Sequence, residues 1–392
     1  MTEYPEAADR RHTNSVKWDV QDGELPMTIA DMDFKTSPAI IEAMREKLTL
    51  GAFGYEDIPD EYFNAVADWY EHQHHFRPQT DWMIFTTGVV PAISSAVRRL
   101  TSLGDNVLVQ APVYNIFYNS IVNSGRHVLS SDLVYDEEQH SYSVDWEDLE
   151  NKLADPLTNL MILCNPHNPV GIIWTRDQLI RLAKLCQKYH VTIFSDEVHG
   201  DFTFNEDGYV PMFSLPEELI QNLEVAVSPS KTFNVAALHA ATVIVPNDNL
   251  RAQVSRGLNS EELAEPNLMA IPGTIAAYEK GADWLSAVLD AIEDNRNVVK
   301  EFVHEQLSDY VAIVPGEATY LIWLDVHKLT NDSTALVKFI REKTGLILSA
   351  GSIYGGDGHH FLRMNVACPT KLLLSGLDRL AQGITEWQQK QG

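Results

Sequence analysis

The stretch Ser228-Pro229-Ser230-Lys231-Thr232-Phe233-Asn234 follows the apolar run Val225-Ala226-Val227, which is typical of a short buried strand. A lysine just past the end of such a strand lies at the edge where open α/β sheets bind their ligands. The flanking hydroxyl groups can bind phosphate oxygens, and a lysine in a partly dry pocket can lose its proton and act as a nucleophile. A Ser-x-Ser-Lys turn alone is more often a solvated loop, so its meaning depends on the rest of the chain.

Other short apolar runs predict strands that alternate with helices. They lie at residues 83–85, 107–109, 160–163, 191–194 and 242–245. Helical patterns separate them, and one of these helices opens with a capping box made by Thr175 and Gln178. Near-continuous apolar strands alternating with helices indicate a mainly parallel, doubly wound sheet that is covered on both faces. The predicted fold class is therefore α/β.

The two ends of the chain have different patterns. Residues 1–36 favour an extended arm, and Ser37-Pro38 opens a helix. After residue 283 a long helix leads to a smaller set of strands and helices that is typical of an α+β unit. We therefore predict three parts: an N-terminal arm that joins the small domain (1–40), a large domain (41–283) and a small C-terminal domain (284–392).

Composition and charge argue against several classes of protein. The chain has 29 basic and 55 acidic residues, and its net charge of −26 disfavours nucleic acid or an anionic membrane as a partner. Cys164, Cys186 and Cys368 are too scattered for a disulfide framework or a zinc site, which favours a reducing compartment. No signal peptide is recognisable, and no apolar run reaches the ~18 residues of a membrane helix. We expect a soluble, cytoplasmic protein.

Five residues of particular chemistry follow the ends of predicted strands. Gly88 stands between a strand and a helix start, where free backbone N–H groups and the helix dipole favour a phosphate. Tyr114, Asn168, Asp196 and Lys231 follow four other strands. Because the carboxyl ends of parallel strands share one edge of a sheet, we expect these five residues to converge.

This set meets the requirements of pyridoxal 5′-phosphate (PLP) chemistry. A lysine forms the Schiff base, and a carboxylate keeps the pyridine nitrogen protonated so that the ring can accept electrons. An aromatic ring can stack on the cofactor, and an amide can donate a hydrogen bond to its phenolic oxygen. Each residue taken singly also has a structural explanation: Asp196 as a turn cap, Asn168 as a turn residue, Tyr114 as core. Their joint placement favours a cofactor site.

Motifs along almost the whole chain strengthen this interpretation. They include Ala30-Asp31-Met32-Asp33-Phe34, Phe53-Gly54-Tyr55, Gly88-Val89-Val90-Pro91, Pro112-Val113-Tyr114, Cys164-Asn165-Pro166-His167-Asn168-Pro169, Ser195-Asp196-Glu197-Val198-His199, Ser230-Lys231-Thr232-Phe233-Asn234 and Arg363-Met364-Asn365-Val366-Ala367. In this order they resemble the fold-type I PLP-dependent enzymes, and among these the cystathionine β-lyase-like C–S lyases related to MalY and PatB.

The resemblance implies roles around the cofactor. Lys231 would be the Schiff-base lysine and, once released by substrate, the general base at Cα. Asp196 would pair with the pyridine nitrogen, Asn168 would bond the phenolic oxygen and Tyr114 would stack on the ring. The remaining cofactor-binding residues would be Gly88, Val89, Val90, Ser228 and Ser230, together with His199, which the sequence also allows to be a packed side chain.

The resemblance also implies a substrate site and a partner. Arg363 would bind the substrate carboxylate through its bidentate guanidinium, with Asp33, Tyr114 and Asn168 nearby. Tyr55 would reach the cofactor phosphate of a neighbouring subunit, which implies a homodimer with shared active sites. One departure is His239, which stands where aminotransferase relatives carry an arginine eight residues after the lysine, so the phosphate site is expected to be less positive.

The implied reaction is β-elimination from cystathionine or another cysteine S-conjugate, which gives a thiol, pyruvate and ammonia. Two alternatives stay open: an aminotransferase on the same scaffold, and a lyase with an added regulatory, protein-binding role. His72 and His75 could share a helix face, but no further ligand is apparent, so a solvated helix end is expected there and no metal site.

Overall fold

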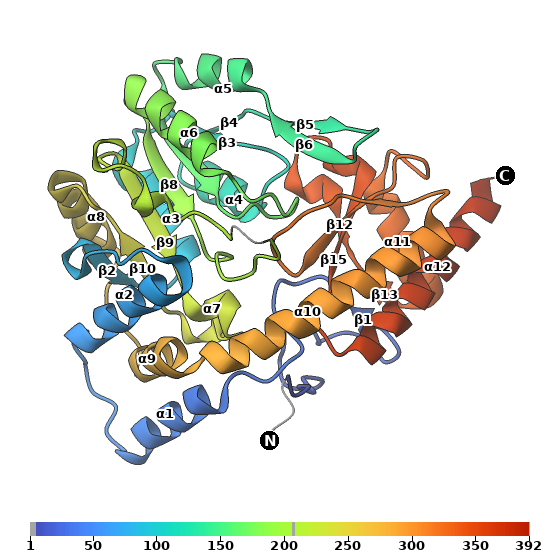
Figure 1. The fold of residues 1–392 in the computed structure, drawn as a ribbon, viewed down its shortest axis with the longest axis horizontal. Helices are drawn as coiled ribbons and strands as arrows, with labels where there is room; N and C mark the ends of the chain where they lie inside the picture. The colour runs from blue at the N-terminus through green and yellow to red at the C-terminus, as the bar shows by residue number, and fades with distance from the viewer. Residues whose placement is uncertain (1–4, 206–207, 392) are drawn as a thin grey trace.

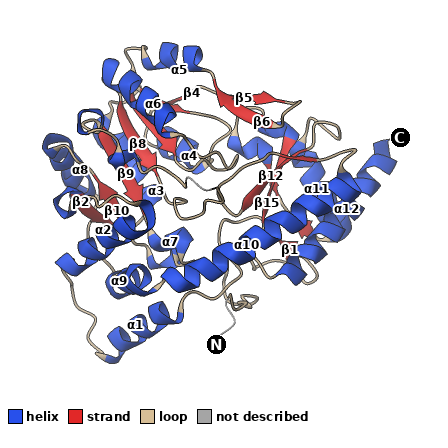
Figure 2. Ribbon diagram, viewed as in Figure 1, coloured by secondary structure: helices blue, strands red, loops and turns tan. Residues whose placement is uncertain are grey.

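The computed structural model describes residues 5–205 and 208–391. In these residues the largest sheet has seven strands, in the order β2-β10-β9-β8-β7-β3-β4 (Figures 1 and 2). Its strands are β2 (Met83–Thr86), β3 (Asn106–Val109), β4 (His127–Ser130), β7 (Thr158–Cys164), β8 (Thr192–Asp196), β9 (Leu223–Val227) and β10 (Ala241–Ile244). Among these seven strands, β10 is the one that runs in the opposite direction to the other six. The predicted α/β fold with a mainly parallel sheet is confirmed.

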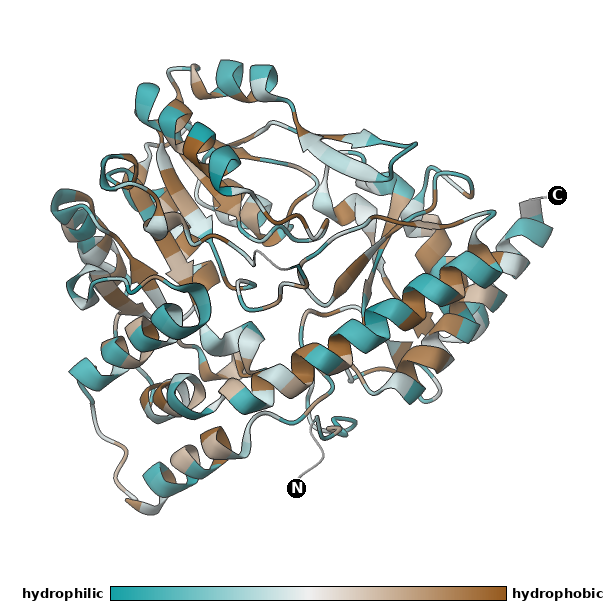
Figure 3. Cartoon of the chain, in the orientation of Figure 1, coloured by the Kyte–Doolittle hydropathy of each residue, from teal (hydrophilic) through white to brown (hydrophobic). Residues whose placement is uncertain are grey.

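Helices cover both faces of this sheet, as its side-chain alternation requires. In β7, Leu160 and Ile162 pack with one cluster, whereas Met161 and Leu163 pack with another on the opposite face. The first cluster includes side chains of α3 (Val89–Leu100), α4 (Ile116–Asn123) and α8 (Asp248–Ser260), and the second those of α2 (Asp60–His74), α5 (Trp146–Leu153), α6 (Arg176–Lys188) and α9 (Ala270–Lys280). Burial on both faces explains the continuous apolar runs in the sequence (Figure 3).

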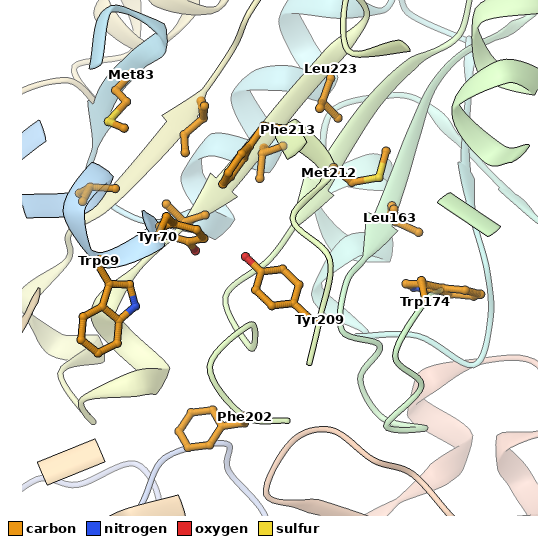
Figure 4. Close-up of a cluster of buried hydrophobic side chains, with 14 of the residues drawn as sticks. Trp69, Tyr70, Met83, Leu163, Trp174, Phe202, Tyr209, Met212, Phe213 and Leu223 are labelled. Carbon is orange, nitrogen blue, oxygen red and sulfur yellow. The ribbon is translucent and has the colours of Figure 1, made fainter. Parts of the chain in front are cut away.

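Aromatic side chains pack α2 against two segments outside the strands of the large sheet. Tyr70 of α2 packs edge-to-face on Phe213 with ring centroids 5.3 Å apart, and Trp69 packs on Phe233 at 5.3 Å. Figure 4 shows Trp69, Tyr70 and Phe213 in this core, together with Met212 and with Leu223 of β9. Phe233 belongs to the stretch that carries Lys231, so this packing also supports the lysine turn.

The second sheet is antiparallel and has the order β11-β12-β15-β14. It consists of β11 (Ala312–Ile313), β12 (Leu321–Asp325), β14 (Ser349–Ala350) and β15 (Phe361–Asn365), and it packs with α11 (Ser333–Thr344) and α12 (Thr370–Gln391). The long helix α10 (Ala282–Phe302) leads from the large sheet to this one (Figure 1). A separate hairpin is formed by β5 (Leu133–Asp136) and β6 (Ser141–Val144).

The N-terminal arm packs with the small sheet. Its strand β1 (Leu25–Pro26) pairs in parallel with β13 (Leu346–Ile347), and Trp18, Leu25 and Met27 are buried in the small-domain cluster. The predicted boundaries at 40/41 and 283/284 fall inside α1 (Pro38–Thr49) and α10, so the domain limits stay a prediction. Among the helices of the described residues, none has both the length and the hydropathy needed to cross a lipid bilayer.

Candidate active site

A cavity of about 270 Å³ lies at the carboxyl edge of the large sheet, between residues that follow its strands. The sequence predicted this convergence, and the lining contains Gly88, Val89, Val90, Tyr114, Asn168, Asp196, His199, Ser228, Ser230 and Lys231. Their roles in binding or catalysis stay predictions, but the structure places all of them around one space.

Two turns form one end of the cavity. Gly88 precedes α3, and among the described residues no side chain caps the first N–H groups of that helix. Uncapped N–H groups together with the helix dipole favour an anion at this position. The second turn is the short helix α7 (Pro229–Thr232), which Ser228 caps by accepting a hydrogen bond from Ser230 N at 3.1 Å. The proline at its first position has the backbone angle that a helix start requires.

Lys231 projects from α7 and has its amine in a mostly buried position. Its Nζ donates a hydrogen bond to the backbone oxygen of Ala30 at 2.6 Å. Burial lowers the pKa of Lys231, and the nearby charge of Arg363 lowers it further, whereas Asp31 and Asp196 act in the opposite direction. A buried amine with a lowered pKa is suited to act as a nucleophile and as a base.

Asp196 ends β8 and turns its carboxyl group toward the same cavity. Burial raises its pKa to about 6, although the N–H of Val198, 3.2 Å from Oδ1, and the charge of Lys231 favour the ionised form. The adjacent Glu197 does not line the cavity, and its Oε1 accepts hydrogen bonds from Asn165, Ser195 and Met212. Only the first carboxyl group of the Asp-Glu pair is therefore available to a ligand there.

Tyr114 and His199 are neutral members of the lining. Burial and the charge of Asp196 raise the pKa of Tyr114 to about 12. Burial, with Lys231 and Arg363, lowers the pKa of His199 to about 3. The Nδ1 atom of His199 is buried and has no hydrogen-bond partner among the described residues.

Arg363 reaches the site from β15 of the small sheet. Its Nη1 donates to Asn168 Oδ1 at 3.1 Å and its Nη2 donates to the backbone oxygen of Thr28 at 3.0 Å. The guanidinium lies over the ring of Tyr354, 4.8 Å from the ring centroid. Its Nε is buried without a partner in the described part of the chain. Arg363 does not itself line the cavity but contacts Asn168, which does.

Asp33 lies away from the cavity, and its position does not favour the predicted role in substrate binding. Its Oδ2 accepts from Lys17 Nζ at 2.9 Å, and its Oδ1 accepts from Trp18 Nε1 at 2.7 Å and from Arg10 Nη2 at 3.0 Å. With both oxygens occupied inside the arm, Asp33 serves to fold that arm.

Tyr55 and the histidine-rich stretch also lie outside the cavity lining. Tyr55 is fully exposed, so its predicted role depends on a second subunit. His72 and His75 are exposed at the end of α2, where His75 has a left-handed backbone. The neighbouring His74 instead pairs with Asp201, with Nε2 2.8 Å from Oδ1.

Several groups near Lys231 were not predicted from the sequence. The backbone oxygen of Ala30 carries no side-chain signal, because every residue has such an oxygen. Cys164 also lines the cavity, and its Sγ accepts from Asn168 N at 3.4 Å. Burial and the charge of Asp196 raise the pKa of this thiol, so it stays neutral. His239, which the resemblance placed near the phosphate site, lines the cavity as well.

The residues present fit the predicted cofactor. An amine with a lowered pKa, a buried carboxyl group and an anion-binding helix start meet in one cavity. Asn168 turns its Oδ1 toward Arg363, and its Nδ2, which has no acceptor among residues 5–205 and 208–391, can donate toward a ligand. The arrangement can hold a phosphorylated aldehyde by its phosphate and ring while an amine attacks its carbonyl carbon.

Comparison with known proteins identifies the family. The model of "Aminotransferase class I and II" matches residues 23–380. Cystathionine β-lyase PatB of Bacillus subtilis is 38% identical over 97% of this chain and 100% of its own length, and protein MalY of Escherichia coli is 32% identical over 98% and 99%. The crystal structure of cystalysin from Treponema denticola, which contains pyridoxal 5′-phosphate, superposes with a TM-score of 0.94 at 29% identity over 98% of this chain and 99% of that one. The chain therefore belongs to the aminotransferase class I and II family, within the group that includes PatB and MalY, as its sequence predicted.

Proposed function

We propose that the protein is a PLP-dependent C–S β-lyase that cleaves cystathionine or another cysteine S-conjugate to a thiol, pyruvate and ammonia. The observation that carries the proposal is the meeting of Lys231, Asp196 and Asn168 around one cavity, with Arg363 bonded to Asn168. The relationship to PatB, a cystathionine β-lyase, supports elimination of a thiol as the reaction.

Bound PLP supplies the electron sink that stabilises negative charge at the substrate Cα. Asp196 would hold a proton on the pyridine nitrogen, which requires its carboxyl group to be ionised. The start of α3 and Ser230 would hold the phosphate, and Asn168 would donate its Nδ2 to the phenolic oxygen. Lys231 would take the proton from Cα, for which its lowered pKa is suited.

Arg363 would bind the substrate carboxylate. Its Nε has no partner in the described residues, and its Nη groups bond only neutral oxygens there, so the guanidinium is not paired with any acidic side chain. A buried and unpaired guanidinium fork favours a carboxylate ligand. The pairing with Asn168 would hold the substrate beside the ring of the cofactor.

The test is product analysis with the purified protein and added PLP. With L-cystathionine as the sole substrate, we expect pyruvate and free thiol in equal amounts and no requirement for a keto acid. An aminotransferase is the second candidate, because the matching family model covers that class. Product that forms only when a keto acid is supplied would replace the lyase with an aminotransferase.

We further propose that the enzyme is a homodimer in which Tyr55 reaches the phosphate bound by the partner. The exposed side chains of Leu48, Leu50, Phe53 and Tyr55 on and after α1 support this, because a cluster of apolar side chains on the surface favours a protein contact. Sedimentation of the wild type and of Tyr55→Ala, with cofactor retention measured in parallel, tests it.

The three cysteines are free and buried, which supports a cytoplasmic location.

A further inference from the structure

Asn234 connects the lysine turn to the N-terminal arm. It lies three residues after Lys231, and its Oδ1 accepts from Met32 N at 3.0 Å. Its Nδ2 donates to the backbone oxygens of Met32 at 3.0 Å and Phe34 at 2.8 Å. One side chain therefore forms three hydrogen bonds to an arm segment about 200 residues away in sequence.

The arm segment held in this way presents the oxygen that receives the Lys231 amine. The backbone oxygen of Ala30 accepts from Lys231 Nζ at 2.6 Å and from the hydroxyl of Tyr320 at 3.0 Å. Asn365 holds the same segment from β15, through the backbone oxygens of Ile29 and Asp31. Ala30 is thus fixed from both sides, and its oxygen points into the cavity.

Turn geometry alone does not account for these contacts. Asn234 has a φ of 55°, which asparagine tolerates better than most residues, and glycine would satisfy the same backbone requirement. The three hydrogen bonds to the arm require the amide, and glycine could not form them. The identity of the residue is therefore explained by the link between the two segments.

We propose that Asn234 is a positioning residue, which holds the arm so that the Ala30 oxygen receives the Lys231 amine whenever that amine is not bonded to the cofactor. The inference rests on the proposed function, in which substrate displaces Lys231 and the freed amine then acts as a base. A fixed acceptor would keep that amine close to the reacting atoms.

The hydrogen bond to Ala30 also affects the proton on Lys231. A carbonyl oxygen binds an ammonium group more strongly than a neutral amine, so its loss lowers the pKa of the lysine. The other titratable or charged groups around this amine are Asp31, Asp196, His199, Tyr320 and Arg363. Asp31 belongs to the segment that Asn234 holds, and its charge also raises the pKa of Lys231, so its displacement would lower that pKa in the same direction as loss of the Ala30 bond. The other four groups belong to other segments of the chain.

The test is Asn234→Gly, which keeps the positive φ and removes the amide. The pKa of Lys231 is measured in the full chain without cofactor, by competitive acetylation from about pH 6 to about pH 10 and peptide mass spectrometry. We expect the pKa to fall by about one unit, so that the amine holds its proton about tenfold less tightly. We also expect lyase kcat to fall about tenfold with KM almost unchanged.

A matched control is available in Asn295 of α10. Its Nδ2 donates to the backbone oxygens of Val366 and Cys368, as that of Asn234 does to two backbone oxygens of the arm, and its Oδ1 accepts from the hydroxyl of Thr370; Asn295 does not line the cavity. Asn295→Ala should reduce stability like Asn234→Gly but leave the pKa of Lys231 unchanged. Equal pKa values in the wild type and Asn234→Gly would overturn the proposal. Because acetylation requires no PLP, it decides this point even if the wild type fails to bind the cofactor, an outcome that would contradict the proposed function.

Discussion

Two buried acids on adjacent strands of the large sheet have very different positions. Asp196 ends β8, whereas Glu224 is the second residue of β9 and lies beside Phe194 in the strand register. Burial raises the pKa of both, to about 6 for Asp196 and to about 8 for Glu224. Asp196 lines the cavity with Lys231, but both oxygens of Glu224 are fully buried without a partner among the described residues.

The difference is the depth of each acid within the sheet. Asp196 pairs in register with Ala226, two residues closer to the carboxyl edge than Glu224. At the edge, a buried carboxyl group has a cavity, a helix start and an amine as neighbours. In the interior, the carboxyl group of Glu224 has no hydrogen-bond partner in the described residues, and its raised pKa keeps it protonated near neutral pH. A raised pKa therefore marks a candidate site only together with its position in the fold.

The largest expected effect at the edge belongs to Lys231→Ala. Without the amine there is neither a covalent link to the cofactor nor a base at Cα, so lyase turnover should fall by at least about 10³-fold. The variant should fold, because the side chain of Lys231 makes no hydrogen bond to an acidic side chain in the described part of the chain. Circular dichroism and a coupled pyruvate assay check both statements, and turnover similar to the wild type would remove Lys231 from the mechanism.

Asp196→Asn should come next, with a loss of lyase kcat of about 10²-fold, because a neutral amide cannot keep the pyridine nitrogen protonated. In the wild type, cofactor affinity should weaken as the pH falls below about 6, since protonation then removes the carboxylate. The Asn variant should lack this acid limb. Fluorescence titrations with PLP at several pH values measure it, and identical pH profiles in both proteins would argue against the pairing.

Arg363→Lys tests the proposed substrate-binding role of the arginine that the small sheet brings to Asn168. A lysine keeps the charge but not the planar fork, so kcat/KM for cystathionine should fall by about tenfold to 10²-fold, mostly through KM. Affinity for PLP should not change, because the substrate carboxylate is bound separately. If PLP affinity fell in parallel, Arg363 would belong to the cofactor site.

Glu224→Gln should have the smallest effect on activity and a clear effect on stability. The pKa of Glu224 in the folded protein, about 8, exceeds the ordinary value of a glutamate. The contribution of Glu224 to the free energy of unfolding is therefore fully present at low pH and is lost as the pH rises toward 8. We expect the free energy of unfolding of the wild type to fall by about 2 kcal/mol more than that of the variant between about pH 6 and about pH 8. Urea unfolding at the two pH values measures this difference. Equal changes in the wild type and in Glu224→Gln would contradict the raised pKa of Glu224.

The position of a residue at the carboxyl edge of the large sheet also decides how well the sequence predicts it. Gly88, Asn168, Asp196 and Lys231 follow apolar strands, and the shared edge of parallel strands brings them together without any knowledge of packing. The Arg363–Asn168 contact, the Ala30 oxygen and the bonds of Asn234 join segments that only the folded chain brings close. The motif around Asp33 was recognisable, but its partners Lys17 and Trp18 decide that its carboxylate faces the arm.

The most direct measurement is borohydride reduction of the purified protein in the presence of PLP, followed by peptide mass spectrometry. We expect a single phosphopyridoxyl addition, located on Lys231, and no such addition in Lys231→Ala. Absence of the modification from the wild type, or its presence on a different lysine with Lys231 unmodified, would contradict the assignment of this cavity as the cofactor site.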